Sequence, residues 1–120
     1  MNYVVPRLFP VTKSINVGQA ANVAASVTIP APGVARRTII DCYRWSYSGG
    51  TPVGKITITE NGVTVLEFDI TVAGPGADGI PIVFGVNTEI VVTLAAGGAG
   101  VTGKLNVFHY SEPESPNKLR

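Results

Sequence analysis

Short runs of alternating apolar and polar residues fill most of this chain, and this pattern predicts β-strands. No segment keeps apolar residues at helical spacing for three turns, and 14 Gly and 9 Pro interrupt the chain. The expected strands lie near residues 22–29, 37–47, 55–59, 63–70, 80–84, 88–94 and 101–110. About seven or eight strands at this spacing predict an all-β fold, a single two-sheet antiparallel β-sandwich of jelly-roll or immunoglobulin-like type.

The hairpin between residues 55 and 70 is the clearest local prediction, because Asn61-Gly62 separates two alternating strands. Such a pair is typical of a two-residue type I′ turn. That register, however, mixes polar and apolar residues on both faces of the hairpin. A three-residue loop instead pairs Lys55 with Glu67 on the wet face and gathers the apolar residues on the other. These are Ile56, Ile58, Leu66, Phe68 and Ile70. We therefore expect the three-residue loop.

The two ends of the chain differ from the sandwich, which we assign to residues 20–110. Residues 1–19 form an extended, apolar arm, and its large side chains interleave with prolines. Disordered tails are usually polar, so we expect the arm to dock on its own domain or on a neighbour, although fraying is the alternative. Its candidate partner-binding residues are Tyr3, Val5, Leu8 and Phe9. Residues 71–79 are expected to be a loop, and residues 111–120 a disordered tail.

The composition is unusually poor in charge. Charged residues make up 14% of the 120 residues, against roughly 25% in typical soluble domains. Such a chain often hides apolar surface in an assembly. The net charge is +1 and the nine Lys and Arg residues are scattered, which argues against nucleic-acid binding. No apolar run approaches the ~20 residues of a membrane helix, and no signal peptide is recognisable.

Candidate chemistry is sparse. The chain has one cysteine, Cys42, and one histidine, His109, so neither an internal disulfide nor a zinc cluster can be assembled. No serine lies in a nucleophile motif. Glu67 and Asp69 fall on the wet face of a strand, and Asp78 is a lone carboxylate in a turn. We expect no catalytic, metal-binding or cofactor-binding residues, no cofactor, and no enzyme activity.

One group of aromatic residues alternates along the strand at 37–47: Tyr43, Trp45 and Tyr47. An exposed row of such rings could stack on sugars. The alternative is that these rings fill the core or a subunit interface, with their polar atoms reaching the edge. We favour the second interpretation and keep the first as the alternative glycan-binding site.

Several stretches of the chain carry a family resemblance. They are VTIPAPGVAR at 27–36, WSYSGG at 45–50 with PVG at 52–54, FDITVAGPG at 68–76, and VTLAAGGAGVTGKLNV at 92–107. Within residues 20–110, the chain resembles small all-β proteins encoded among the head and tail genes of tailed bacteriophages. The resemblance implies a structural or accessory component of a virion, similar to capsid decoration proteins, and it supplies no catalytic residues.

These observations lead to two expected functions. The first is a capsid decoration or cement protein that is made in the host cytoplasm and located in the virion. It would bind other capsid or tail proteins and form a homo-oligomer, with a trimer as the first candidate, without binding nucleic acid or membrane. The second is a host-receptor or glycan-binding module of a tail or head fibre, which would use Tyr43, Trp45 and Tyr47.

Overall fold

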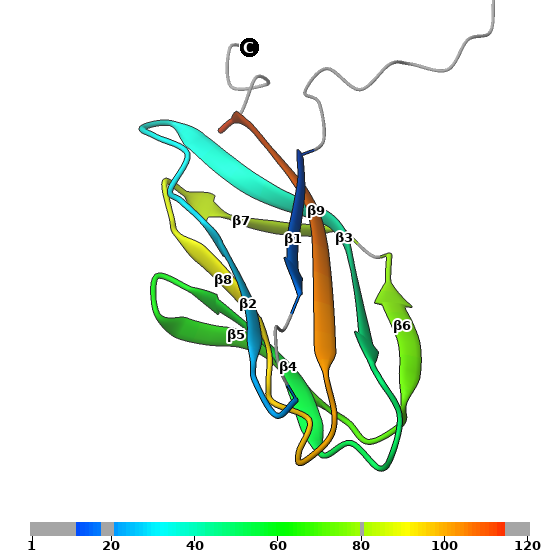
Figure 1. Ribbon diagram of the computed structural model, residues 1–120. Coiled ribbons are helices and arrows are strands. Elements are labelled where there is room, and N and C mark those ends of the chain that lie inside the picture. The colour runs from blue at the N-terminus through cyan, green and yellow to red at the C-terminus, as the bar shows by residue number, and fades with distance from the viewer. Residues whose placement is uncertain (1–11, 18–20, 80, 115–120) are drawn as a thin grey trace, which may run out of the picture.

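The structure is a computed structural model that describes residues 12–17, 21–79 and 81–114. These residues form nine strands and no helix (Figure 1). The strands are β1 Thr12–Val17, β2 Ala25–Ile29, β3 Arg36–Tyr47, β4 Gly54–Glu60, β5 Val63–Ile70, β6 Gly74–Asp78, β7 Ile82–Val86, β8 Ile90–Leu94 and β9 Gly103–Pro113. Each of the seven strands predicted from the sequence overlaps one of them, which confirms the all-β sandwich.

Two antiparallel sheets make up the sandwich. The five-stranded sheet has the order β1-β9-β3, with β6 and β7 both paired to β3, and the four-stranded sheet has the order β2-β8-β4-β5. Because β6 and β7 lie along different parts of β3, they act as one interrupted edge strand. The chain passes from sheet to sheet between β1, β2, β3 and β4. This eight-position arrangement is that of a jelly roll, which decides between the two sandwich types that the sequence left open.

The core lies between the two sheets and follows the alternation of the strands. In β2 the burial pattern is strictly alternating, and the same is true of its partner β8. The inward residues of these two strands are Ala25, Val27, Ile29, Ile90, Val92 and Leu94. They pack against inward residues of β9 such as Leu105 and Val107, which are fully buried. Both sheets therefore contribute to one continuous core.

The hairpin between β4 and β5 differs from the expected one. Glu60 pairs with Val63, and both Asn61 (φ 47°) and Gly62 (φ 83°) are left-handed, which is the geometry of a two-residue type I′ turn. The predicted three-residue loop is wrong. The register then shifts at Val65, which has no partner in the ladder. This β-bulge places the apolar residues of the two strands on one face again. The hairpin therefore combines the type I′ turn that Asn61-Gly62 favours with a buried apolar face.

The apolar face of the hairpin nevertheless consists of the predicted residues. Ile56, Ile58 and Ile70 are buried, and Leu66 and Phe68 pack against the core from partly buried positions. On the other face, Lys55 forms an ion pair with Glu67, with Nζ and Oε2 3.2 Å apart. Lys55 lies opposite Asp69 in the ladder, so this ion pair is diagonal and not directly across the strands as expected.

Between residues 71 and 113, two segments outside the predicted strands are paired. β6 lies inside residues 71–79, which we expected to be a loop, and it pairs with the last part of β3. Its sequence, GPGAD, has no apolar alternation, so the exposed edge of β3 and not local propensity forms it. β9 continues through Pro113 opposite Arg36, which corrects the expected disorder at residues 111–113.

The arm predicted at residues 1–19 is described only in part. Residues 12–17 form β1, which pairs antiparallel with β9, from Thr12 opposite His109 to Val17 opposite Lys104. This section therefore docks on its own domain. The candidate partner-binding residues Tyr3, Val5, Leu8 and Phe9 lie outside the described residues, as do residues 115–120.

Candidate functional site

Two of the three aromatic residues on β3 are in the core. Tyr43 is 0% exposed and Tyr47 is 2% exposed. The hydroxyl of Tyr43 donates a hydrogen bond to Oδ2 of Asp78 at 3.0 Å, and the hydroxyl of Tyr47 donates one to the carbonyl of Ala95 at 2.5 Å. These two rings present no face to solvent, so an exposed row of three aromatic residues is not formed.

Burial also changes the acidity of these tyrosines. Removal from water disfavours the charged phenolate, so the pKa of both Tyr43 and Tyr47 is raised. At Tyr43 the hydrogen bond to Asp78 and the negative charge of that carboxylate raise the pKa further. At Tyr47 the backbone of Lys55 opposes the effect of burial. Both hydroxyls therefore act as neutral donors that anchor the rings.

Trp45 lies at the open edge of the sandwich and is only partly buried. Its ring centroid is 5.8 Å from that of Tyr43 and 5.6 Å from that of Phe68 on β5, where the two rings meet edge to face. The indole ring also lies over Gly76 of β6, where a Cβ would overlap it. Trp45 thus joins the two sheets and keeps one part of its surface accessible.

The residues between these aromatics face the other way. Because Tyr43 and Tyr47 point into the core, Arg44 and Ser46 lie on the outer face of the five-stranded sheet. On the neighbouring strand β9, Leu105 is buried, which places Lys104 and Asn106 on the same outer face. The sequence analysis singled out the aromatic positions of β3 and missed the polar positions between them.

An open hollow of about 480 Å³ lies on this outer face, across β9, β3 and β6. Its lining residues are Arg44, Trp45, Ser46, Pro75, Gly76, Ala77, Lys104 and Asn106. We call it the outer-face hollow. The ladders order it in two rows: Lys104, Ser46 and Pro75 lie opposite one another, and Asn106, Arg44 and Ala77 form the next row.

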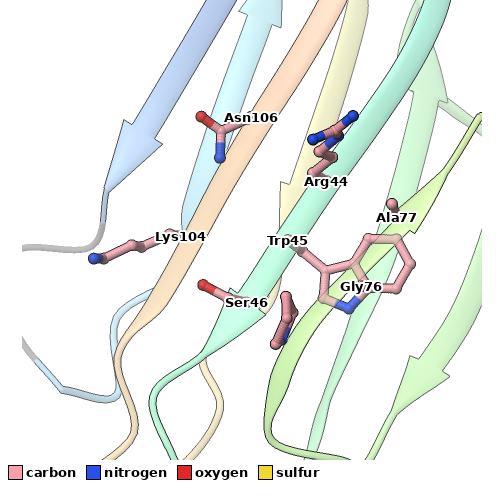
Figure 2. A pocket seen from close by; sticks show the side chains of 8 residues that line it. Arg44, Trp45, Ser46, Gly76, Ala77, Lys104 and Asn106 are labelled. Carbon is pink, nitrogen blue, oxygen red and sulfur yellow. The ribbon is translucent and has the colours of Figure 1, made fainter.

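The shape of the outer-face hollow follows from the sizes of its side chains. Ser46, a small residue, lies next to both Arg44 and Lys104, and the small residues Gly76 and Ala77 line the β6 side of the hollow. Figure 2 shows Lys104 and Asn106 projecting from β9, and Arg44 and Ser46 from β3. Four side chains that can hydrogen-bond therefore surround a depression whose remaining wall is apolar.

The charge in the outer-face hollow is positive. Arg44 and Lys104 are both exposed, and none of the lining residues is acidic. The guanidinium of Arg44 lies over the ring of Phe108, with its carbon 5.9 Å from the ring centroid, which favours one position of the side chain. Asp78, on β6, is hydrogen-bonded to Tyr43 on the opposite face of the sheet.

A second, smaller hollow of about 270 Å³ lies on the other side of Gly76. The loop after β5 forms much of it, together with Phe68 and Asp69. Trp45, Pro75 and Gly76 line both hollows. Since Trp45 is the single tryptophan of the chain, its fluorescence can report on events in either of them.

The remaining candidate residues are separate from one another. Cys42 lies opposite Phe108 on the β3–β9 ladder, whereas His109 lies opposite Ile40 beyond the register shift at residue 41. Burial lowers the pKa of His109. Over residues 12–17, 21–79 and 81–114, no three His, Cys, Asp or Glu residues are grouped as metal ligands would be.

The part of the chain that the structure describes contains no helix of the length and apolarity that crossing a membrane requires.

No protein-family model and no curated protein matches the sequence. Among solved structures, the chain is similar to a carbohydrate-binding module CBM36 determined in complex with calcium and xylotriose, with a TM-score of 0.45, 18% identity, and coverage of 84% of this chain and 99% of that chain. It is also similar to a family 35 carbohydrate-binding module from an environmental isolate, with a TM-score of 0.47, 14% identity, and coverage of 81% and 76%.

A third similar structure has a different role. It is the virus-like particle of the extra small virus of the prawn Macrobrachium rosenbergii, with a TM-score of 0.35, 10% identity, and coverage of 91% and 83%. With TM-scores below 0.5 and identities of 18% or less, these likenesses carry nothing about fold, ligand or assembly. The phage origin, the virion location and the virion partners stay predictions.

Proposed function

We propose that this protein is a non-catalytic binding module whose ligand is a saccharide held in the outer-face hollow. The observation that carries the proposal is the combination of Arg44, Ser46, Lys104 and Asn106 around one depression with an apolar wall. Ligand sites are typically concave and largely apolar, with a few placed polar groups, and have volumes of roughly 300–1,000 Å³. The outer-face hollow meets each of these criteria.

The polar groups of the hollow match the chemistry of a sugar. Hydroxyl groups both donate and accept hydrogen bonds, and the side chains of Ser46 and Asn106 do the same. Arg44 and Lys104 add donors only. Pro75 and Ala77 supply carbon-bound hydrogens against which the apolar face of a pyranose ring can lie. The site differs from the one expected from the sequence, since Trp45 is the only member common to both.

The proposal is tested by a glycan array followed by titration of the full chain with each sugar that binds. We expect binding to change the emission of Trp45. Ala77→Phe should fill the hollow and abolish binding, whereas Thr28→Phe, an exposed position on the other sheet, should leave it unchanged. Absence of any bound glycan, or equal binding by the two variants, would contradict the proposal.

A second candidate is the structural virion role, in which the protein decorates or cements a capsid as a homo-oligomer. The observation that favours it is a set of highly exposed valines: Val34 at 86%, Val53 at 76% and Val72 at 73%. Gly54 pairs with Ile70, so the loops that carry Val53 and Val72 lie at the same end of the sandwich. Contiguous exposed apolar patches mark interaction sites, and we take Val53 and Val72 to be part of one.

Light scattering with size exclusion tests this role on the full chain, on Val53→Asp with Val72→Asp, and on a chain that lacks residues 1–11. The deletion stops before Thr12 because β1 begins there. We expect a defined oligomer that becomes a monomer in at least one variant. A monomer in all three cases would leave the saccharide-binding proposal alone.

A further inference from the structure

The two cations of the outer-face hollow set the kind of saccharide that it accepts. We infer that the ligand is an acidic sugar whose carboxylate binds between Arg44 and Lys104. This inference rests on the proposed function, because it names the class of saccharide for the same site. Two observations support it. In the part of the chain that the structure describes, two cations lie around the hollow without a carboxylate partner, and two cations elsewhere in the domain are paired with carboxylates.

Arg44 and Lys104 are close neighbours on one face. Ser46 lies directly opposite Lys104, and Arg44 is two positions from Ser46 on the same strand. Diagonal positions of this type are separated by roughly 7–8 Å between Cα atoms, which long side chains span easily. The guanidinium of Arg44 rests over Phe108, and the side chain of Lys104 points away from Arg44 in Figure 2, so both side chains have to turn toward Ser46 to bind one anionic group there.

Two other cations of the described part of the chain are paired with carboxylates. Arg37 pairs with Glu112, with 2.9 Å between Nη2 and Oε2, and Lys55 pairs with Glu67. Within residues 12–17, 21–79 and 81–114, neither Arg44 nor Lys104 forms an ion pair with a carboxylate. Adjacent cations repel each other, and an anion placed between them removes that repulsion.

The neighbouring side chains suit a carboxylate that is attached to a sugar ring. A guanidinium binds a carboxylate with two parallel hydrogen bonds, and an ammonium group adds a third. Ser46 and Asn106 remain available for the ring hydroxyls. A carboxylate at Arg44 and Lys104 would place the ring toward Pro75 and Ala77, on the apolar side of the hollow.

The same charges could in principle attract a nucleic acid, and the rest of the hollow argues against this. Single-stranded nucleic acids are held by exposed aromatic rings on which bases stack. The indole of Trp45 is directed toward Phe68, between the sheets, and the ring of Phe108 lies beneath Arg44. The chain has a net charge of +1, so it offers little attraction for a long phosphate backbone.

The test compares acidic oligosaccharides with their methyl esters, which differ only in the charge of the carboxyl groups. Oligomers of galacturonate, mannuronate and glucuronate are titrated into the full chain, with Trp45 emission and heat of binding as readouts. We expect at least one acid to bind about tenfold or more tightly than its ester, since charge-assisted hydrogen bonds are the stronger ones. Added salt should weaken this binding.

Variants assign the effect to the two cations. Arg44→Gln and Lys104→Gln should each weaken binding of the acid about tenfold and leave binding of the ester unchanged. Arg44→Lys should retain part of the affinity. Lys55→Gln is the matched control, because it removes one exposed cation from the other sheet, and it should have no effect. Thermal unfolding of each variant separates lost binding from lost folding.

Each other outcome overturns a defined part of the argument. Equal binding of acid and ester would refute the acidic ligand and leave a neutral saccharide as the proposed ligand. No binding of any acid, ester or neutral glycan would remove the proposed function itself. A DNA oligonucleotide of matched charge could also bind equally tightly and lose affinity in the same variants. That result would make the hollow a general anion site and contradict the acidic saccharide as its ligand.

Discussion

The indole ring of Trp45 lies directly over Gly76, its partner in the β3–β6 ladder, where no larger residue fits. The backbone of Gly76 is not in the left-handed region, so the constraint is steric only. Gly76→Ala should therefore displace the ring and lower the free energy of unfolding by about 1–3 kcal/mol, as overpacking does. Urea denaturation measures the loss, and Trp45 emission should report the displacement.

Gly79 provides the control for this substitution. A Cβ at Gly79 would meet no atom within 4 Å, and its φ is also not left-handed. Gly79→Ala should therefore leave the free energy of unfolding within about 0.5 kcal/mol of the original value. If the two variants have the same free energy of unfolding, the packing of the Trp45 ring does not depend on the space above Gly76.

The hydrogen bond from Tyr43 to Asp78 predicts a second effect. Tyr43→Phe keeps the buried ring but removes the donor, which should lower the free energy of unfolding at neutral pH by about 1–2 kcal/mol. Because Asp78 stays partly exposed, water can replace part of the lost bond. Chemical denaturation of the two proteins gives the difference, and an unchanged stability would mean that the bond contributes nothing net.

The same pair predicts a dependence on alkaline pH. The pKa of Tyr43 is raised above the ordinary value of 10.0, so the unfolded chain loses this proton first as the pH rises. The contribution of the neutral hydroxyl is complete below pH 10.0 and is lost progressively above it. The stability difference between the original protein and Tyr43→Phe should therefore shrink above pH 10.0. A constant difference up to pH 11 would contradict the raised pKa.

His109 predicts the opposite dependence at acidic pH. Burial lowers its pKa from 6.5, so the unfolded chain binds the proton first as the pH falls. Stability from the neutral imidazole is complete above pH 6.5 and is lost as the pH falls below that value. Urea midpoints at pH 7.5, 6.5 and 5.5 should fall more steeply for the original protein than for His109→Gln. An equal fall of the urea midpoint with pH in the two proteins would exclude His109 as the cause of the lost stability.

The strands could be predicted from the sequence because their burial follows their local alternation. In β2 and β8 every second residue is buried, and β5 begins and ends where the pattern places it. β6 could not be predicted, since Gly74–Asp78 has no such pattern and pairs only because β3 leaves an edge there. The bulge at Val65 could not be predicted either. The alternation of apolar and polar residues along one strand does not show where its pairing with the neighbouring strand shifts.

The candidate site was predicted less well, for a related reason. Strand alternation indicates that Tyr43 and Tyr47 share a face, but it does not say which face is the core. The burial of those rings turned Arg44 and Ser46 outward. Lys104 and Asn106 are 58 or more positions away in the sequence, and only the β3–β9 ladder brings them alongside. Prediction of the outer-face hollow would therefore have required knowing that β3 pairs with β9.

The turn at Asn61 and Gly62 gives a final prediction that separates the two hairpin geometries. The side-chain oxygen of Asn61 accepts a hydrogen bond from the amide of Glu89 at 2.8 Å, and Asn61→Ala and Asn61→Gly both remove this contact. They differ in the left-handed φ of 47°, which glycine adopts without strain and alanine does not. Asn61→Ala should therefore be less stable than Asn61→Gly by about 1 kcal/mol. In a three-residue loop with a right-handed Asn61, alanine would be at least as stable as glycine, so urea denaturation of the two variants decides between the geometries.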